Sequence, residues 1–217
     1  MNRRSLPIAT ALTATAVLVL TACGSGGGKT EANDKIAGVD KGETKPTTPS
    51  SSPIAPPGRP EITLPSDVKD VFEGWKIGDA TKDAILNDAA QAQSATNYAI
   101  TQGDVDEPAL AFYRQGDALI SGMKWVQSFV DDGISYTGTV RYFKPEISVF
   151  DEKSAGLVFC ADESGAHNKD RKTGKVDKTP PSDKSFLLYS TRLEKNAQGV
   201  WQTTKLVSQR GHKTCTL

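Results

Sequence analysis

The spacing of apolar residues changes once along this chain, and that change limits the fold more than any other feature. Between Asp79 and Asp132, apolar residues recur with the 3.6-residue period of an amphipathic helix. After Gly133 they alternate with polar residues at a period of two, which is typical of half-buried strands. Helices followed by hairpin-connected strands predict an α+β domain in which N-terminal helices cover one face of an antiparallel sheet.

Two helical segments are expected in the first part of the domain. The first begins near Asp79 or Thr81, either of which can cap a helix, and ends at Gly103. The second follows Pro108 and is expected to break near Gly116 or Gly122, because glycine weakens a helix by about 1 kcal/mol relative to alanine. A turn at residues 131–133 closes this part of the chain.

Five strand segments are expected after this turn. They read ISYTGTVRY, EISVFD, SAGLVFCAD, SFLLYSTRLEK and GVWQTTKLVSQR. Turns are predicted at Lys144-Pro145, Asp151–Ser154 and Asn196–Gly199, and the charged segment 163–184 is expected to be a solvated loop. Before the helices, Val68–Trp75 is expected to form a turn or a short helix.

Residues 24–66 show neither period and are rich in glycine, serine and proline. Seven of the 12 prolines of the chain fall between Pro46 and Pro65. A segment of this composition buries little apolar surface and stays disordered, with its proline-rich part extended. We therefore expect a disordered tether over residues 23–66 and one folded α+β domain over residues 67–217.

The N-terminus has the layout of a secretory signal. Arg3 and Arg4 precede the apolar stretch Ile8–Leu20, which is shorter than the roughly 20 residues of a spanning helix. The next residues complete the sequence LTAC, which resembles the bacterial lipobox. The resemblance implies a signal peptide over residues 1–22 and a diacylglycerol anchor on Cys23, with the domain on the extracytoplasmic side of the cell membrane. The alternative is an ordinary secreted protein with an incidental cysteine.

Two cysteines, Cys160 and Cys215, remain beyond the anchor. In an oxidising compartment an even pair predicts a disulfide, here joining the C-terminal tail to the strand GLVFC. Such a bridge closes a loop of about 55 residues, worth roughly 4 kcal/mol in the chain-entropy model. Two free thiols or a metal site are the alternatives, but this spacing, with His167 and His212 in polar segments, matches no common zinc pattern.

Charge and motifs exclude several function classes. Without the signal, the chain has 24 basic and 26 acidic residues, a net charge of −2 that gives no electrostatic reason to bind nucleic acid. The sequence contains no glycine-rich phosphate loop and no G-x-S-x-G nucleophile elbow. We therefore assign no cofactor, no metal ligand and no catalytic residue.

Short motifs in the strand region resemble the nuclear-transport-factor-2-like domain, also called SnoaL-like or cystatin-like, of secreted or lipid-anchored proteins from high-GC Gram-positive bacteria. The matching residues are Cys160, Asp162, Thr173, Gly174, Trp201 and Cys215. The resemblance covers about residues 80–217 and implies a cone, in which a curved sheet wraps around helices and leaves a cavity at its open end. The long segment 163–184 and the glycines of the second helix depart from this pattern and leave the shape of the cavity open.

The resemblance also raises the question of catalysis, because enzymes of this superfamily use a buried Asp or His, often with a Tyr, to move protons next to a carbonyl. The candidates here are Asp104, Asp106, Asp117 and Tyr98. The three carboxylates lie in turn-like or polar contexts, which favours solvated side chains. Eight aromatic residues could line a ligand pocket, but we expect core positions for Tyr136, Tyr142, Phe143, Phe150, Phe159, Phe186, Tyr189 and Trp201.

From these features we expect a membrane-anchored binding or interaction module. Its partner would be an envelope protein or a small apolar ligand. The alternative is a pocket enzyme of the isomerase or cyclase type that acts on a small apolar substrate. A buried Asp, Glu or His in an apolar cavity, within hydrogen-bond reach of a Tyr or a second acid, would favour the enzyme.

Overall fold

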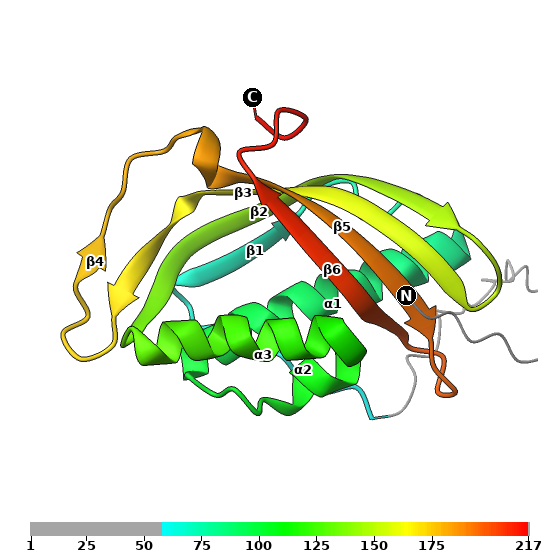
Figure 1. Cartoon of the computed structure of the whole chain (residues 1–217), viewed down its shortest axis with the longest axis horizontal. Helices are drawn as coiled ribbons and strands as arrows, with labels where there is room; N and C mark the ends of the chain where they lie inside the picture. The colour runs from blue at the N-terminus through cyan, green and yellow to red at the C-terminus, as the bar shows by residue number, and fades with distance from the viewer. Residues whose placement is uncertain (1–57, 217) are drawn as a thin grey trace, which may run out of the picture. The chain divides into compact units, whose positions relative to one another are not determined.

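Three helices cover one face of a curved sheet in the computed structural model, which describes residues 58–216 (Figure 1). The helices are α1 (Ala80–Gln102), α2 (Pro108–Tyr113) and α3 (Gly116–Asp131). The strands are β1 (Val68–Phe72), β2 (Ile134–Val149), β3 (Ser154–Asp170), β4 (Val176–Asp177), β5 (Phe186–Lys195) and β6 (Trp201–Arg210), with a short 3-10 helix η1 (Asp183–Ser185) before β5. The predicted α+β class is confirmed. The predicted signal, Cys23 and most of the predicted tether lie outside the described residues.

The sheet has the strand order β1-β2-β3-β5-β6, and β4 pairs only with the end of β3. All neighbouring strands are antiparallel except β1, which runs parallel to β2 with Val68 opposite Gly138. The main core fills the space between the helices and the sheet. Its largest fully buried side chains are Trp201, Tyr113, Phe159, Ile85 and Leu86.

The helix boundaries follow the residues that predicted them. Asp79 caps α1 by accepting a hydrogen bond of 2.9 Å from the Lys82 amide, and Gly103 ends it in the left-handed conformation with φ 70°. The predicted break in the second helical segment lies at Gly116, where φ is 56°. Gly122 stays inside α3, where a side chain would lie 3.5 Å from Arg114 Cδ.

Two local predictions are wrong. Val68–Phe72 is a strand and not a turn or a short helix, because it pairs along its whole length with β2. Lys144-Pro145 is not a turn between strands: β2 continues through it, with a register shift and a φ of 51° at Lys144. A bulge of this kind bends a strand without ending it.

The segment 163–184 is more ordered than expected. Residues 163–170 belong to β3, and residues 165–170 pair with the start of β2, so that Asp170 lies opposite Ile134. Polar residues fit here because much of this strand end is solvent-accessible. Only the part beyond Asp170, with the short β4 and η1, connects the strands as a loop.

The ordered domain also begins earlier than residue 67. Ile62 and Leu64, which we expected to belong to the tether, pack against the main core. Arg59 forms an ion pair with Asp88 of α1. The proline-rich composition of this region predicted a tether, but these three residues contact the folded domain.

A disulfide joins Cys160 and Cys215, as predicted. Both half-cystines are buried with Phe143 and Phe186 in a second, smaller cluster, against which Leu188 packs. The tail after β6 therefore closes over apolar side chains that the helices do not cover.

No helix within residues 58–216 combines the length and the apolarity needed to cross a bilayer.

Candidate functional site

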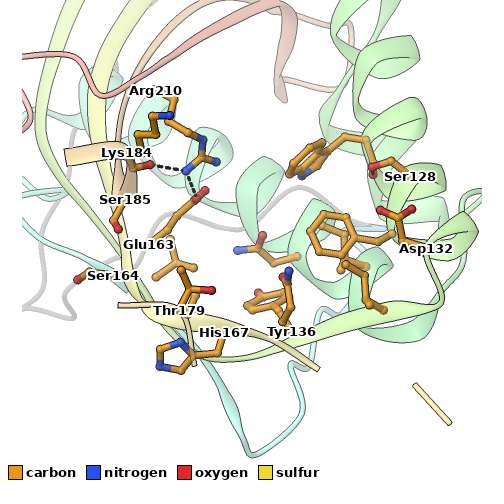
Figure 2. A pocket seen from close by; sticks show the side chains of 18 of the residues that line it. Ser128, Asp132, Tyr136, Glu163, Ser164, His167, Thr179, Lys184, Ser185 and Arg210 are labelled. Atoms are coloured by element: carbon orange, nitrogen blue, oxygen red, sulfur yellow. Dashed lines mark hydrogen bonds and ion pairs between the residues drawn. The ribbon is translucent and has the colours of Figure 1, made fainter. Parts of the chain in front are cut away.

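A pocket of about 560 Å³ lies where the C-terminal part of α3 meets the start of β2 and the end of β3 (Figure 2). The connection from β4 to β5 and the last residue of β6 complete it. The apolar residues of the lining include Trp125, Phe129, Ile134, Tyr136 and Val140. Trp125 is 49% exposed and packs edge-on against Phe129, with the two ring centroids 5.1 Å apart. The volume lies in the range of small-molecule sites.

A β-bulge brings polar groups of β3 to this pocket. Thr139 pairs with Gly165 while Arg141 pairs with Asp162, so two residues, Glu163 and Ser164, lie opposite the single residue between them on β2. Both line the pocket. A bulge at this point reverses the alternation of the strand and places consecutive side chains at the same cavity.

Gly138 allows β2 and β3 to approach each other closely beside the bulge. Its φ is 102°, and an added Cβ would lie 2.1 Å from the carbonyl oxygen of Gly165. Only glycine fits there without moving the backbone. This glycine therefore fixes the shape of the strands at the pocket.

Glu163 and Arg210 form an ion pair of 2.8 Å at the pocket wall. The same nitrogen of Arg210, Nη1, donates to the carbonyl oxygen of Lys184 at 2.7 Å. Burial raises the pKa of Glu163 above its usual range, and the Arg210 guanidinium opposes that shift. Figure 2 shows Arg210, Lys184 and Glu163 on one wall, with Ser128 and Asp132 across the pocket.

Tyr136 contributes a hydroxyl that has no hydrogen-bond partner within the described part of the chain. The residue is 7% exposed and lines the pocket. Burial raises the pKa of this phenol above its ordinary value, so the hydroxyl stays neutral and can donate. An unpaired buried hydroxyl is unfavourable by about 1–3 kcal/mol, which a ligand atom could recover.

A buried polar network lies behind Asn97, another lining residue. Asn97 Nδ2 donates to Asp70 at 2.8 Å and to the Tyr142 hydroxyl oxygen at 2.9 Å. Ser94 also donates to Asp70, at 2.8 Å. Burial raises the pKa of Asp70, while the bonds from Ser94 and Asn97 lower it. The network fixes the orientation of the Asn97 amide.

The connection between β3 and β5 forms a further side of the pocket through Thr179, Pro180 and Ser182. At its start, Arg171 donates to the carbonyl oxygens of Ile100 and Thr101 at the end of α1. At its other end, Arg210 holds the carbonyl of Lys184. Two arginines therefore fasten this connection to the body of the domain.

The predicted proton-transfer candidates do not meet at the pocket. Asp104, Asp106 and Asp117 are exposed, and Asp104 only accepts a local bond of 3.0 Å from the Asp106 amide. Tyr98 is half-buried on α1 and is not among the lining residues. The solvated interpretation of the three carboxylates is confirmed.

The two histidines have different places. His167 is a lining residue of the pocket and lies on β3 opposite Thr137 of β2. Figure 2 shows that its ring is directed away from Tyr136. His212 is half-buried in the C-terminal turn, where its Nδ1 accepts a bond of 3.3 Å from the Thr214 amide. The solvated loop predicted for residues 163–184 is wrong at His167, because β3 continues through it.

Most of the predicted core aromatics are buried in one of the two clusters, but Phe150 is 58% exposed and Tyr136 also faces the pocket.

The motif residue Asp162 is buried and forms an ion pair of 2.9 Å with Arg141. Thr173 and Gly174 form the turn after β3, where Thr173 donates to Asp170. Trp201 is buried at the start of β6.

The charged residues of the pocket were not identified as site residues from the sequence. Glu163, Lys184 and Arg210 are spread over about 50 residues of the sequence and belong to no recognisable motif. The one local signal was the pair of glycines, Gly138 and Gly165, which meet across two strands at the bulge. Recognising it requires the strand register, which the sequence did not provide.

The chain matches no protein-family model and no curated protein sequence. Similar solved structures include the intermembrane-space region of the chloroplast protein ARC6, with 14% identity, a TM-score of 0.42, and coverage of 62% of this chain and 99% of that chain. A ketosteroid isomerase-like protein from Erwinia carotovora atroseptica has 18% identity and a TM-score of 0.36, covering 56% and 92%. An NTF-2 like protein of unknown function from Shewanella oneidensis has 16% identity and a TM-score of 0.36, covering 56% and 96%. At these values the likeness says nothing about activity or ligand.

Proposed function

We propose that this chain is a lipid-anchored binding module of the extracytoplasmic side of the cell membrane, and that its domain holds a small, largely apolar molecule. The observation that carries the binding role is the pocket of about 560 Å³, whose lining includes the aromatic residues Trp125, Phe129 and Tyr136. Aromatic lining residues favour apolar ligands, and the unpaired Tyr136 hydroxyl can orient them. Anchoring through Cys23 rests on the lipobox-like sequence and the tether composition.

Binding is tested with N-phenyl-1-naphthylamine, a neutral apolar probe whose fluorescence rises when it leaves water. We expect saturable binding to the purified chain and a loss of about tenfold in affinity for Trp125→Ala, because half of this ring faces the pocket or solvent. Phe150→Ala is the matched control, since Phe150 is 58% exposed and lies outside the pocket lining. Absence of saturable binding, or an equal loss in both variants, would contradict the proposal.

Anchoring has its own test. Cys23→Ala is expressed in a bacterium with lipoprotein processing, and membranes are separated from the soluble fraction. The variant is expected to lose both membrane sedimentation and incorporation of labelled fatty acid. A variant that keeps both would show that Cys23 is not the anchor, whatever the pocket binds.

A second candidate is a pocket enzyme of the isomerase or cyclase type. It is favoured by Glu163, a carboxyl of raised pKa at an apolar-lined pocket. Against it, Glu163 pairs with Arg210, and no hydrogen bond within residues 58–216 joins an acid to Tyr136. The enzyme would exchange the α-protons of cyclopentanone in deuterium oxide faster than its Glu163→Gln variant, whereas a binding module would show no difference.

A further inference from the structure

The charged side chains of the pocket are distributed unevenly between its two sides, and this distribution bears on the ligand. Arg210 and Lys184 lie on the same wall, where Glu163 is the one acidic lining residue beside them. Asp132 lies across the pocket, near the end of α3. When its three charged groups are ionised, the wall of Arg210, Lys184 and Glu163 therefore has a net charge of +1.

Arg210 is held in place without using all its donors. Its Nη1 atom makes both contacts, to Glu163 at 2.8 Å and to the Lys184 carbonyl at 2.7 Å. Within residues 58–216, its Nε and Nη2 atoms donate to no protein group. A guanidinium that is fixed at one nitrogen and open at the others can bind the oxygens of a carboxylate or a sulfonate.

The second cation has no acidic partner among the described residues. Lys184 is exposed at the pocket wall, and the six ion pairs of this part of the chain do not include it. Its main chain is tied to Arg210, which keeps the two cationic residues adjacent. Trp125 and Phe129 line the same pocket. They belong to α3, the helix whose Ser128 lies across the pocket from Arg210 in Figure 2.

We infer that the ligand is an amphipathic organic anion, with an aromatic or aliphatic body against Trp125 and Phe129 and an acidic group toward Arg210 and Lys184. This inference rests on the proposed binding function and specifies the ligand class of the same pocket. Glu163 then has a definite effect: it occupies one nitrogen of Arg210 and reduces the positive charge that the anion meets.

Two fluorescent probes with a common skeleton test this inference. N-Phenyl-1-naphthylamine is neutral, and 8-anilino-1-naphthalenesulfonate adds one sulfonate to it. We expect the full chain to bind the sulfonate at least about threefold more tightly, as expected for one nearby charge in a water-rich site. Lys184→Gln should lower the affinity for the sulfonate about threefold more than it lowers the affinity for the neutral probe.

Glu163→Gln gives the opposite sign and is therefore the stronger test. The amide retains the shape of the side chain but removes its charge, so the affinity for the sulfonate should rise about threefold. Lys205→Gln serves as the control, because Lys205 is an exposed β6 residue outside the pocket lining. Circular dichroism of each variant verifies that it is folded.

The outcomes separate the two proposals. If neither probe binds, the proposed binding function fails. If both probes bind equally, or if Lys184→Gln and Glu163→Gln change both affinities by the same factor, the pocket binds apolar molecules but the anionic ligand class is wrong. Weaker binding of the sulfonate in Lys205→Gln would also overturn the inference, because it would show attraction by the general surface charge.

Discussion

Two arginine–carboxylate pairs lie near the two ends of β6 and differ in burial. At the start of the strand, Arg59 pairs with Asp88, whose side chain is 1% exposed and also accepts the Trp201 amide at 2.8 Å. At its end, Arg210 pairs with Glu163, whose side chain is 28% exposed at the pocket. The first carboxylate is enclosed by protein donors, whereas the second pair leaves donors open to a ligand. An arginine–carboxylate ion pair therefore lies in the interior at one end of β6 and at the candidate site at the other end.

The largest effect is expected at the enclosed pair. Arg59→Ala leaves the Asp88 carboxylate buried without a cation, so the free energy of unfolding should fall by about 3–5 kcal/mol. Urea unfolding measures it, and Arg192→Ala is the control, because its pair with Glu194 is exposed and worth under about 1 kcal/mol. Equal losses in the two variants would show that the N-terminal segment does not stabilise the domain.

The disulfide ranks next, and it holds the chain just beyond the pocket end of β6. Replacing both Cys160 and Cys215 by alanine should lower the free energy of unfolding by about 2–4 kcal/mol. Peptide mapping without reductant should find this bridge within the domain. Two free thiols in the native protein, or an unchanged unfolding midpoint in the double variant, would refute the stabilising role of the bridge.

A smaller loss is expected at the open pair. Arg210→Ala should reduce the free energy of unfolding by about 1 kcal/mol, because water can reach the Glu163 carboxylate that it leaves behind. Urea unfolding beside Arg59→Ala gives the comparison directly. A loss as large as that of Arg59→Ala would mean that the pocket pair is a structural element like the enclosed one.

The smallest effect is a pH dependence at the open pair. Glu163 has a raised pKa in the folded protein, so the folded state keeps a proton that the unfolded state loses above about pH 4.3. Its contribution to stability is thus present at low pH and is lost as the pH rises through the folded pKa. Relative to Glu163→Gln, the wild type should become less stable between pH 4 and pH 7. A constant or opposite difference in urea unfolding would contradict the raised pKa.

The sequence predicted the elements whose signals are local. The helical period, the cap at Asp79, the stop at Gly103 and the break at Gly116 all depend on neighbouring residues, and the structure confirms them. The strand alternation after Gly133 and the pairing of the two half-cystines were equally accessible. The α+β class followed from these features alone.

The site could not be predicted in the same way, because it depends on the strand register. Glu163 reaches the pocket only through a bulge opposite β2, and Arg210 meets it from a strand that is not adjacent to β3. Asp70 came from a segment expected to be a turn or a helix, and Arg59 from the expected tether. Each of these contacts joins residues distant in the chain, which no local period reveals.

The central claim is that the pocket end of the domain binds a ligand while the enclosed end only supports the fold. The most direct measurement is an amide ¹H–¹⁵N correlation spectrum recorded during titration with N-phenyl-1-naphthylamine. We predict that the largest shifts occur at Trp125, Phe129, Glu163 and Arg210, with Asp88 and Trp201 unchanged. Shifts centred on Asp88 and Trp201, or no saturable shifts at all, would contradict it.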